Sequence, residues 1–193
     1  MFRPYENKGV IMMDDIKNYQ VEERLKNGNP VIIRAIRPDD NVRIKEAFKN
    51  LDPQSVYTRL FTFKKELTDS DLKRITEVDF EKEVALVVAR GTGNHEVIIG
   101  SGRYFVLEGG EDGPHAEVAF MVEEDYQGQG IAKMIIRHLT AIARSRGLTA
   151  FEAEVLRENK AMLTAFARCG LPMTQQYTGE TMHVTLSLTG PTI

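Results

Sequence analysis

The chain has 193 residues, of which 42% are hydrophobic and 27% charged, values that suit one soluble domain with a hydrophobic core. Its net charge of -3 gives no basic surface of the kind that binds nucleic acid. The single cysteine, Cys169, excludes an intrachain disulfide, and the four histidines lack the spacing of metal ligands. Residues 1–10 do not resemble a secretory signal and no segment approaches the ~20 apolar residues of a membrane span, so we expect a cytoplasmic protein without metal or membrane contacts.

The chain begins with a polar lead-in over residues 1–29, in which residues 21–27 are expected to form a short helix ended by Gly28. One domain is expected over residues 30–190. Its first strand, 31–36, is rich in β-branched residues and ends before Pro38. Helices are then expected over residues 41–50, which bury Val42, Ile44, Ala47 and Phe48, over 52–60, and from 68 to about 77. Strands over 84–90, 96–108 and 115–122, joined by glycine-rich turns including 109–113, predict an antiparallel meander.

The pattern changes after residue 122. A helix over residues 130–146 places Ile131, Ile135, Leu139 and Ile142 on one stripe, and Gly147 ends it. A strand over 149–156, a helix over 159–168 and a hairpin of 173–177 with 181–188 complete the chain. The strands that begin at residues 115 and 149 should lie side by side and parallel. The expected fold is α+β, with a mixed, mostly antiparallel sheet of about six to seven strands flanked by helices.

The segment Gln127-Gly128-Gln129-Gly130 connects a predicted strand to the longest predicted helix. Free N–H groups at a helix N-terminus, together with the helix dipole, form an anion site. Gly128 and Gly130 let the backbone approach a phosphate, and Ala132 keeps the first turn small. Lys133 and Arg137 are expected to add positive charge nearby, and the alternative is that both are simply solvated helix residues. The pattern fits neither the Walker loop nor the dinucleotide fingerprint, and a merely tight turn is the alternative interpretation.

Three segments together resemble the GNAT acetyltransferase superfamily. They are residues 115–122, the loop Gln127-Gly128-Gln129-Gly130-Ile131-Ala132, which fits the CoA-loop pattern [Q/R]-x-x-G-x-[G/A], and residues 154–162. Residues 36–40 and 55–61 make the resemblance closest to the acetyltransferase domain of bacterial protein lysine acetyltransferases. The similarity covers roughly residues 21–188.

This resemblance implies transfer of an acetyl group from acetyl-CoA to a primary amine, either a protein lysine or a small molecule, by direct attack in a ternary complex. It assigns the CoA pyrophosphate to the loop Gln127–Ala132. It also assigns the pantetheine and thioester oxygen to the backbone of Phe120, Met121 and Val122, with an N–H near Met121 as the oxyanion donor. Asn159 would touch the CoA arm, although capping of the last helix alone explains an Asn there.

The proposed general base is Glu117, a carboxylate on an otherwise apolar strand. The alternative explanations are a glutamate at a sheet edge and an ion pair with Arg103 on the preceding strand. Glu154 is the second candidate, for which a solvated sheet face is the simpler interpretation. Tyr57, Arg59 and Tyr177 are further acceptor-side candidates.

One position departs from the family. Many GNAT enzymes carry a Tyr that protonates the leaving thiolate where this chain has Phe166. Because the Tyr is missing, a catalytically silent acyl-CoA-binding or sensor domain is an alternative function. Two further alternatives are an enzyme that transfers a longer acyl group and a nucleotide-binding module. Cys169 is expected as a buried structural thiol. The terminal strands offer an edge through which two copies can pair as a homodimer.

Overall fold

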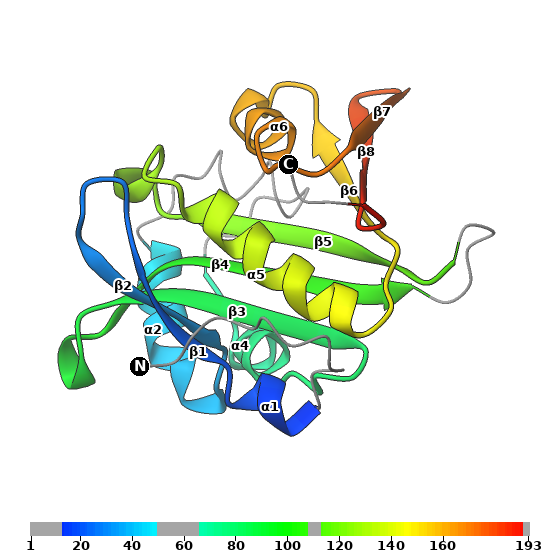
Figure 1. The fold of residues 1–193 in the computed structure, drawn as a ribbon. Coiled ribbons are helices and arrows are strands. Elements are labelled where there is room, and N and C mark those ends of the chain that lie inside the picture. The colour runs from blue at the N-terminus through cyan, green and yellow to red at the C-terminus, as the bar shows by residue number, and fades with distance from the viewer. Residues whose placement is uncertain (1–12, 50–65, 108–112, 191–193) are drawn as a thin grey trace.

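The computed structural model describes residues 13–49, 66–107 and 113–190, and within these ranges the strands form one mixed sheet (Figure 1). The eight strands follow the order β1-β2-β3-β4-β5-β6-β8-β7, and only β5 and β6 pair in parallel. The strands are β1 (Gln20–Arg24), β2 (Pro30–Ala35), β3 (Glu83–Arg90), β4 (Val97–Leu107), β5 (His115–Val122), β6 (Ala150–Leu156), β7 (Met173–Thr178) and β8 (Thr181–Ser187). The helices are α1 (Met13–Lys17), α2 (Asn41–Lys49), α4 (Asp69–Thr76), α5 (Ile131–Ser145) and α6 (Lys160–Ala167). The predicted α+β class is confirmed.

The lead-in forms a strand where a helix was expected. Residues Gln20–Arg24 are β1, which pairs antiparallel with β2, so the helix prediction for residues 21–27 is wrong. The alternation of half-buried and exposed side chains along β1, followed by the buried Leu25, shows a period of two. Gly28, with φ of 85°, closes the tight turn to β2 and does not end a helix. This additional strand raises the sheet above the expected six to seven.

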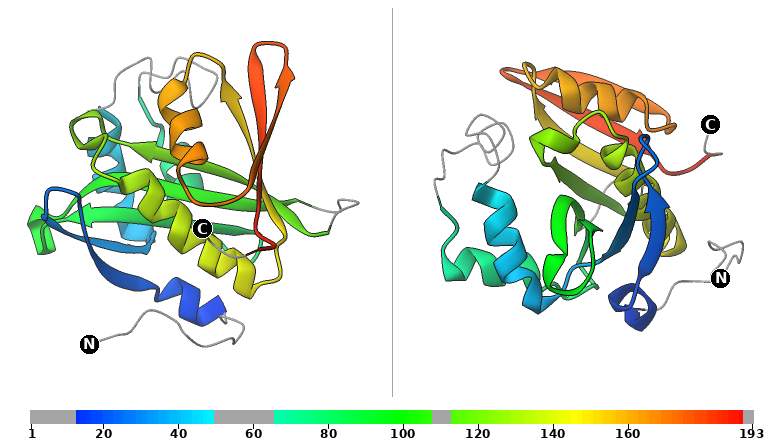
Figure 2. Two further views of the ribbon diagram at one scale, coloured as in Figure 1. Left: turned by 45° about the horizontal axis from the view of Figure 1, so that its top comes forward. Right: turned by 90° about the vertical axis from the view of Figure 1, so that its left-hand side faces the viewer.

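Helices cover both faces of the sheet (Figure 2). A Cβ on Gly100 or Gly102 of β4 would lie only 2.7 and 2.2 Å from side-chain atoms of Ile131 and Ile135, so α5 lies very close to this face. Arg103, whose side chain points to the opposite face, donates a hydrogen bond to the Ile75 carbonyl of α4. Helix α5 is therefore fixed directly against β4.

The antiparallel meander from β2 to β5 and the parallel pairing of β5 with β6 are confirmed. In α2, Ile44 and Phe48 are buried, four residues apart, as expected, but Val42 is 71% exposed because it lies on the outer side of that helix. The expected helix over 52–60, with Tyr57 and Arg59, lies outside the described residues, as does most of the loop 109–113. No helix within the described ranges is long and apolar enough to cross a membrane.

A buried ion pair joins β2 to the beginning of α2. Arg34 and Asp40 are 2% and 0% exposed, and the Arg34 guanidinium donates to both Asp40 carboxylate oxygens at 2.7 and 2.8 Å. Glu96 accepts from the same guanidinium at 2.6 Å. Burial alone would raise the pKa of Asp40, but hydrogen bonds from Arg34 and from the Arg37 N–H outweigh it and hold that pKa below its usual value.

Candidate active site

A gap opens between β5 and β6. The two strands pair only from His115–Glu117 to Ala150–Glu152, and beyond these residues they separate (Figure 1). The gap contains a cavity of about 90 Å³, which the first turn of α6 borders. Its lining includes the predicted residues Glu117, Phe120, Glu154 and Asn159, together with Phe166. The structure thus brings together residues that are up to 49 positions apart in the sequence.

The backbone of β5 presents hydrogen-bonding groups to this gap. The N–H of Glu123, next after β5, donates to the Ile99 carbonyl of β4 at 3.1 Å. N–H groups alternate in direction along a strand, so the Met121 N–H points toward β4, whereas those of Phe120 and Val122 point into the gap. The expected donor near Met121 therefore corresponds to one of its two neighbours.

The predicted phosphate loop follows β5 directly. Gly128 and Gly130 have φ of 75° and 92°, a region that side chains disfavour, and Gly130 is the N-cap of α5. Among the described residues, the N–H groups of Gly128 and Gly130 have no hydrogen-bond partner. A Cβ on Gly128 would contact nothing within 4 Å, so the loop is open to a ligand. Ile131 is 1% exposed and packs against β4, which fixes the helix N-terminus beside the gap.

A network of hydrogen bonds fastens β1 to α5, behind this loop. His138 of α5 lies between Tyr19, which hydrogen-bonds Nδ1, and Glu23, 3.0 Å from Nε2. Arg137 also pairs with Glu23, so its guanidinium is engaged at β1. Burial lowers the pKa of His138, and the neighbouring Arg137 lowers it further, although the hydrogen bond to Glu23 opposes both.

The free energy of unfolding is expected to fall as pH drops below about 6.5, the ordinary pKa of His. Because the pKa of His138 is lowered in the folded protein, the unfolded chain binds the proton first, so this stability is fully present at higher pH. Urea titrations between pH 5.5 and 7.5 measure the effect. His138→Gln should flatten the pH dependence, and an unchanged slope in that variant would exclude His138 as its source.

The exposed carboxylate of Glu117 has no hydrogen-bond or ion-pair partner within the described ranges. Arg103 pairs instead with Glu83, at 2.6 Å, so the alternative ion pair of Glu117 with Arg103 is not formed. Glu154 is bound to His183 Nδ1 at 2.6 Å. Of the two candidate bases, only Glu117 therefore has both carboxylate oxygens without a partner among the described residues.

The α6 end of the cavity is mostly apolar. The Asn159 side-chain oxygen accepts from the Met162 N–H at 3.1 Å, so the capping interpretation is confirmed, and its side-chain nitrogen has no partner in the described part of the chain. Phe166 is 1% exposed and packs 5.4 Å from the Phe120 ring, centroid to centroid. Cys169 is buried, and burial raises the pKa of its thiol, as expected for a structural residue.

One predicted candidate lies away from the cavity, and one residue beside the phosphate loop was not predicted. Tyr177 lies on the edge strand β7, where Arg157 stacks on its ring at 4.9 Å, and it does not line the cavity. Lys26, which the sequence analysis missed, donates its N–H to the Gln129 carbonyl of the phosphate loop at 3.1 Å. The sequence did contain a signal for this position. Val21, Glu23 and Leu25 recur at every second residue, which indicates a strand, and a strand there places Lys26 in the turn that follows it.

Residues 51–171, more than half of the chain, match the sequence profile described as the acetyltransferase (GNAT) family. The chain belongs to this family. Acetyltransferase PA5475 of Pseudomonas aeruginosa is 28% identical over 140 residues, which cover 72% of this chain and 74% of that protein. Acetyltransferase Pat of Mycolicibacterium smegmatis is 30% identical over 159 residues, 82% of this chain but only 46% of Pat.

The fold comparison agrees. The crystal structure of the GNAT domain of S. lividans PAT matches with a TM-score of 0.77 and 29% identity, covering 87% of this chain and 96% of that one. As a GNAT protein, the chain is an N-acetyltransferase that uses an acyl-CoA donor. No group of His, Cys, Asp and Glu suited to a metal ion occurs among the described residues.

Proposed function

We propose that this GNAT protein transfers an acetyl group from acetyl-CoA to a primary amine, on a protein lysine or a small molecule, within a ternary complex. The observation that carries the proposal is the gap between β5 and β6, with an open phosphate loop at one end and, in its wall, a carboxylate that has no partner among the described residues. A solved acetyltransferase of Salmonella typhimurium with acetyl-CoA as its cofactor has the same fold, at 17% identity and a TM-score of 0.58.

The donor occupies the loop and the gap. Backbone N–H groups of the loop Gln127-Gly128-Gln129-Gly130-Ile131-Ala132 bind the pyrophosphate at the N-terminus of α5. The pantetheine then enters between the strands, where the Asn159 side-chain nitrogen is a donor for the CoA arm. The backbone of Phe120, Met121 and Val122 borders the thioester, with the N–H groups of Phe120 and Val122 as candidate donors to its oxygen.

The acceptor must lose a proton before it attacks. A lysine amine has a pKa of about 10.4, so under 0.1% is neutral at pH 7. Glu117 takes this proton, directly or through water, and the amine nitrogen attacks the thioester carbon. The nitrogen–carbon bond forms, the carbon–sulfur bond breaks, and CoA leaves as a thiolate. Phe166 cannot protonate the thiolate, so that proton comes from water or from the amine.

The proposal extends to the protein's surroundings. We place the enzyme in the cytoplasm, and the edge strand β7 provides a surface for pairing of two copies. A catalytically silent acyl-CoA-binding domain is the second candidate, which the apolar Phe166 in place of the family's usual Tyr favours. Turnover by the purified protein distinguishes the two.

Isothermal titration with acetyl-CoA tests the donor site. Wild type should bind in the micromolar range, and Ala132→Asp should abolish binding because its carboxylate lies in the first turn of α5, where the pyrophosphate is held. An acidic residue in the first turn favours the helix itself, so the melting temperature should not fall.

Ala141→Asp is the matched control for this titration. It places the same charge on an exposed position of the same helix, far from the loop, and should bind acetyl-CoA like wild type. No binding by wild type, or equal binding by Ala132→Asp, would refute the proposed donor site.

A further inference from the structure

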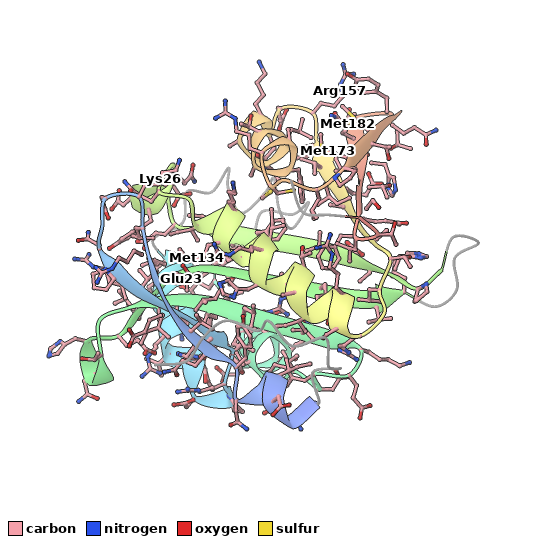
Figure 3. All side chains as sticks on the ribbon, viewed as in Figure 1. Glu23, Lys26, Met134, Arg157, Met173 and Met182 are labelled. Atoms are coloured by element: carbon pink, nitrogen blue, oxygen red, sulfur yellow. The ribbon has the colours of Figure 1, made fainter. Side chains whose placement is uncertain are left out.

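Lys26 lies at the tip of the β1–β2 hairpin, beside the phosphate loop (Figure 3). Its N–H donates to the Gln129 carbonyl at 3.1 Å, which joins the hairpin to the loop by the main chain. The preceding residue, Leu25, is 3% exposed and anchors the tip in the core. A segment over 100 positions away in the sequence therefore forms one wall of the phosphate site.

The side chain of Lys26 runs across Gly130. Its Cγ and Cε lie 3.7 and 3.6 Å from the position that a Cβ would take on Gly130. The ammonium is one bond beyond Cε, and it has no hydrogen-bond or ion-pair partner within the described ranges. The positive charge of Lys26 therefore lies near Gly130, the N-cap of α5.

The hairpin is held in place. Arg24 donates to the Gly28 carbonyl at 3.0 Å, and the Leu25 N–H donates to the Asn29 carbonyl at 3.0 Å, which closes the turn. Glu23 fastens the strand to α5 through Arg137 and His138. The main-chain position of Lys26 is thus fixed relative to the helix whose N-terminus forms the anion site.

Of the other cations near the loop, two are engaged elsewhere, whereas Lys133 in the first turn of α5 has no hydrogen-bond or ion-pair partner among the described residues. Arg137 pairs with Glu23, and Arg90 donates to the Tyr126 hydroxyl at 2.9 Å. The N–H groups of the loop provide partial charges only, whereas a pyrophosphate carries full negative charges. A cation would therefore strengthen binding of the pyrophosphate, and the Lys26 side chain, which runs past Gly130, is placed to supply one.

We propose that Lys26 is a donor-binding residue whose ammonium contacts the pyrophosphate of CoA, opposite the N–H groups of the loop Gln127–Ala132. This inference rests on the proposed function, because it adds a residue to the same donor site. It also gives the N-terminal hairpin a role in binding: the hairpin closes the phosphate loop with a positive charge.

Calorimetric affinities of Lys26→Gln for acetyl-CoA and for its 3′-dephospho form test the assignment. A lost charge-assisted hydrogen bond should weaken both donors by about tenfold, since both contain the pyrophosphate. The KM for S-acetyl-pantetheine, which lacks the pyrophosphate, should stay at the wild-type value. Lys26→Arg should restore most of the affinity.

Lys17→Gln, which changes an exposed lysine of α1 within the same N-terminal segment, is the control and should bind both donors like wild type. Equal affinities of Lys26→Gln and wild type would overturn the inference alone. A loss seen with acetyl-CoA but not with the dephospho form would move the contact to the 3′-phosphate and overturn the pyrophosphate assignment. Failure of wild type to bind acetyl-CoA would instead overturn the proposed function.

Discussion

Glu117→Gln is expected to lower kcat for amine acetylation by about 10²–10⁴-fold, the usual contribution of a general base, while the affinity for acetyl-CoA stays unchanged. The carboxylate lines the cavity at the β5–β6 gap and has no competing partner among the described residues. The amide keeps the shape and removes the basicity. Release of free CoA in the presence of a primary amine measures turnover, and calorimetry measures the affinity.

Glu154→Gln is the matched control, because it makes the same change in a carboxylate of the same cavity that already binds His183. Its loss of turnover should be much smaller. Unchanged turnover in Glu117→Gln would remove Glu117 as the base, and a larger loss in Glu154→Gln would transfer the role. Donor binding without any turnover by wild type would favour the silent domain.

Asp40→Ala is expected to lower the free energy of unfolding by about 3–5 kcal/mol, because it leaves the Arg34 charge buried without its main partner. Arg34 and Asp40 are 2% and 0% exposed, so water cannot replace the lost contact. Urea denaturation at pH 7 measures the change. The lowered pKa of Asp40 also means that its contribution, present above the ordinary pKa, is lost as pH falls through the folded value.

Asp39→Ala provides the comparison for this pair. Asp39 is 74% exposed and approaches Arg43 only to 3.9 Å, so its removal should change stability by no more than about 0.5 kcal/mol. A similar small change in Asp40→Ala would show that Glu96 alone compensates the Arg34 charge.

Sequence periodicity was sufficient for most of the fold. The stripe of Ile131, Ile135 and Leu139 predicted α5, and glycine-rich turns predicted the meander from β2 to β5. The lead-in was interpreted wrongly because β1 has five residues and three of them are charged, so the period of two is weak. The segment forms a strand because it pairs with β2, and local sequence propensity gives no information about that pairing.

The site was only partly accessible to the same reasoning. Local spacing predicted the phosphate loop and the family resemblance suggested Glu117, but the direction of the Met121 N–H depends on the register of β5 against β4. The ion-pair partner of Arg103 also depends on tertiary structure. Arg103 pairs with Glu83 of β3 and not with Glu117, and the sequence alone does not show which carboxylate lies nearer. Lys26 was missed because it lies far from Gly130 in the sequence, and only the folded structure brings the two residues together.

The short parallel seam between β5 and β6 has a mechanical consequence. β4 and β5 share eight residue pairs and β6 and β8 share seven, whereas β5 and β6 share three, so the sheet is joined most weakly next to the cavity. A thioester arm lying between the strands would satisfy backbone groups that the seam leaves unpaired. The donor would then act as a substitute strand between β5 and β6, and its departure as CoA would leave these backbone groups unpaired again.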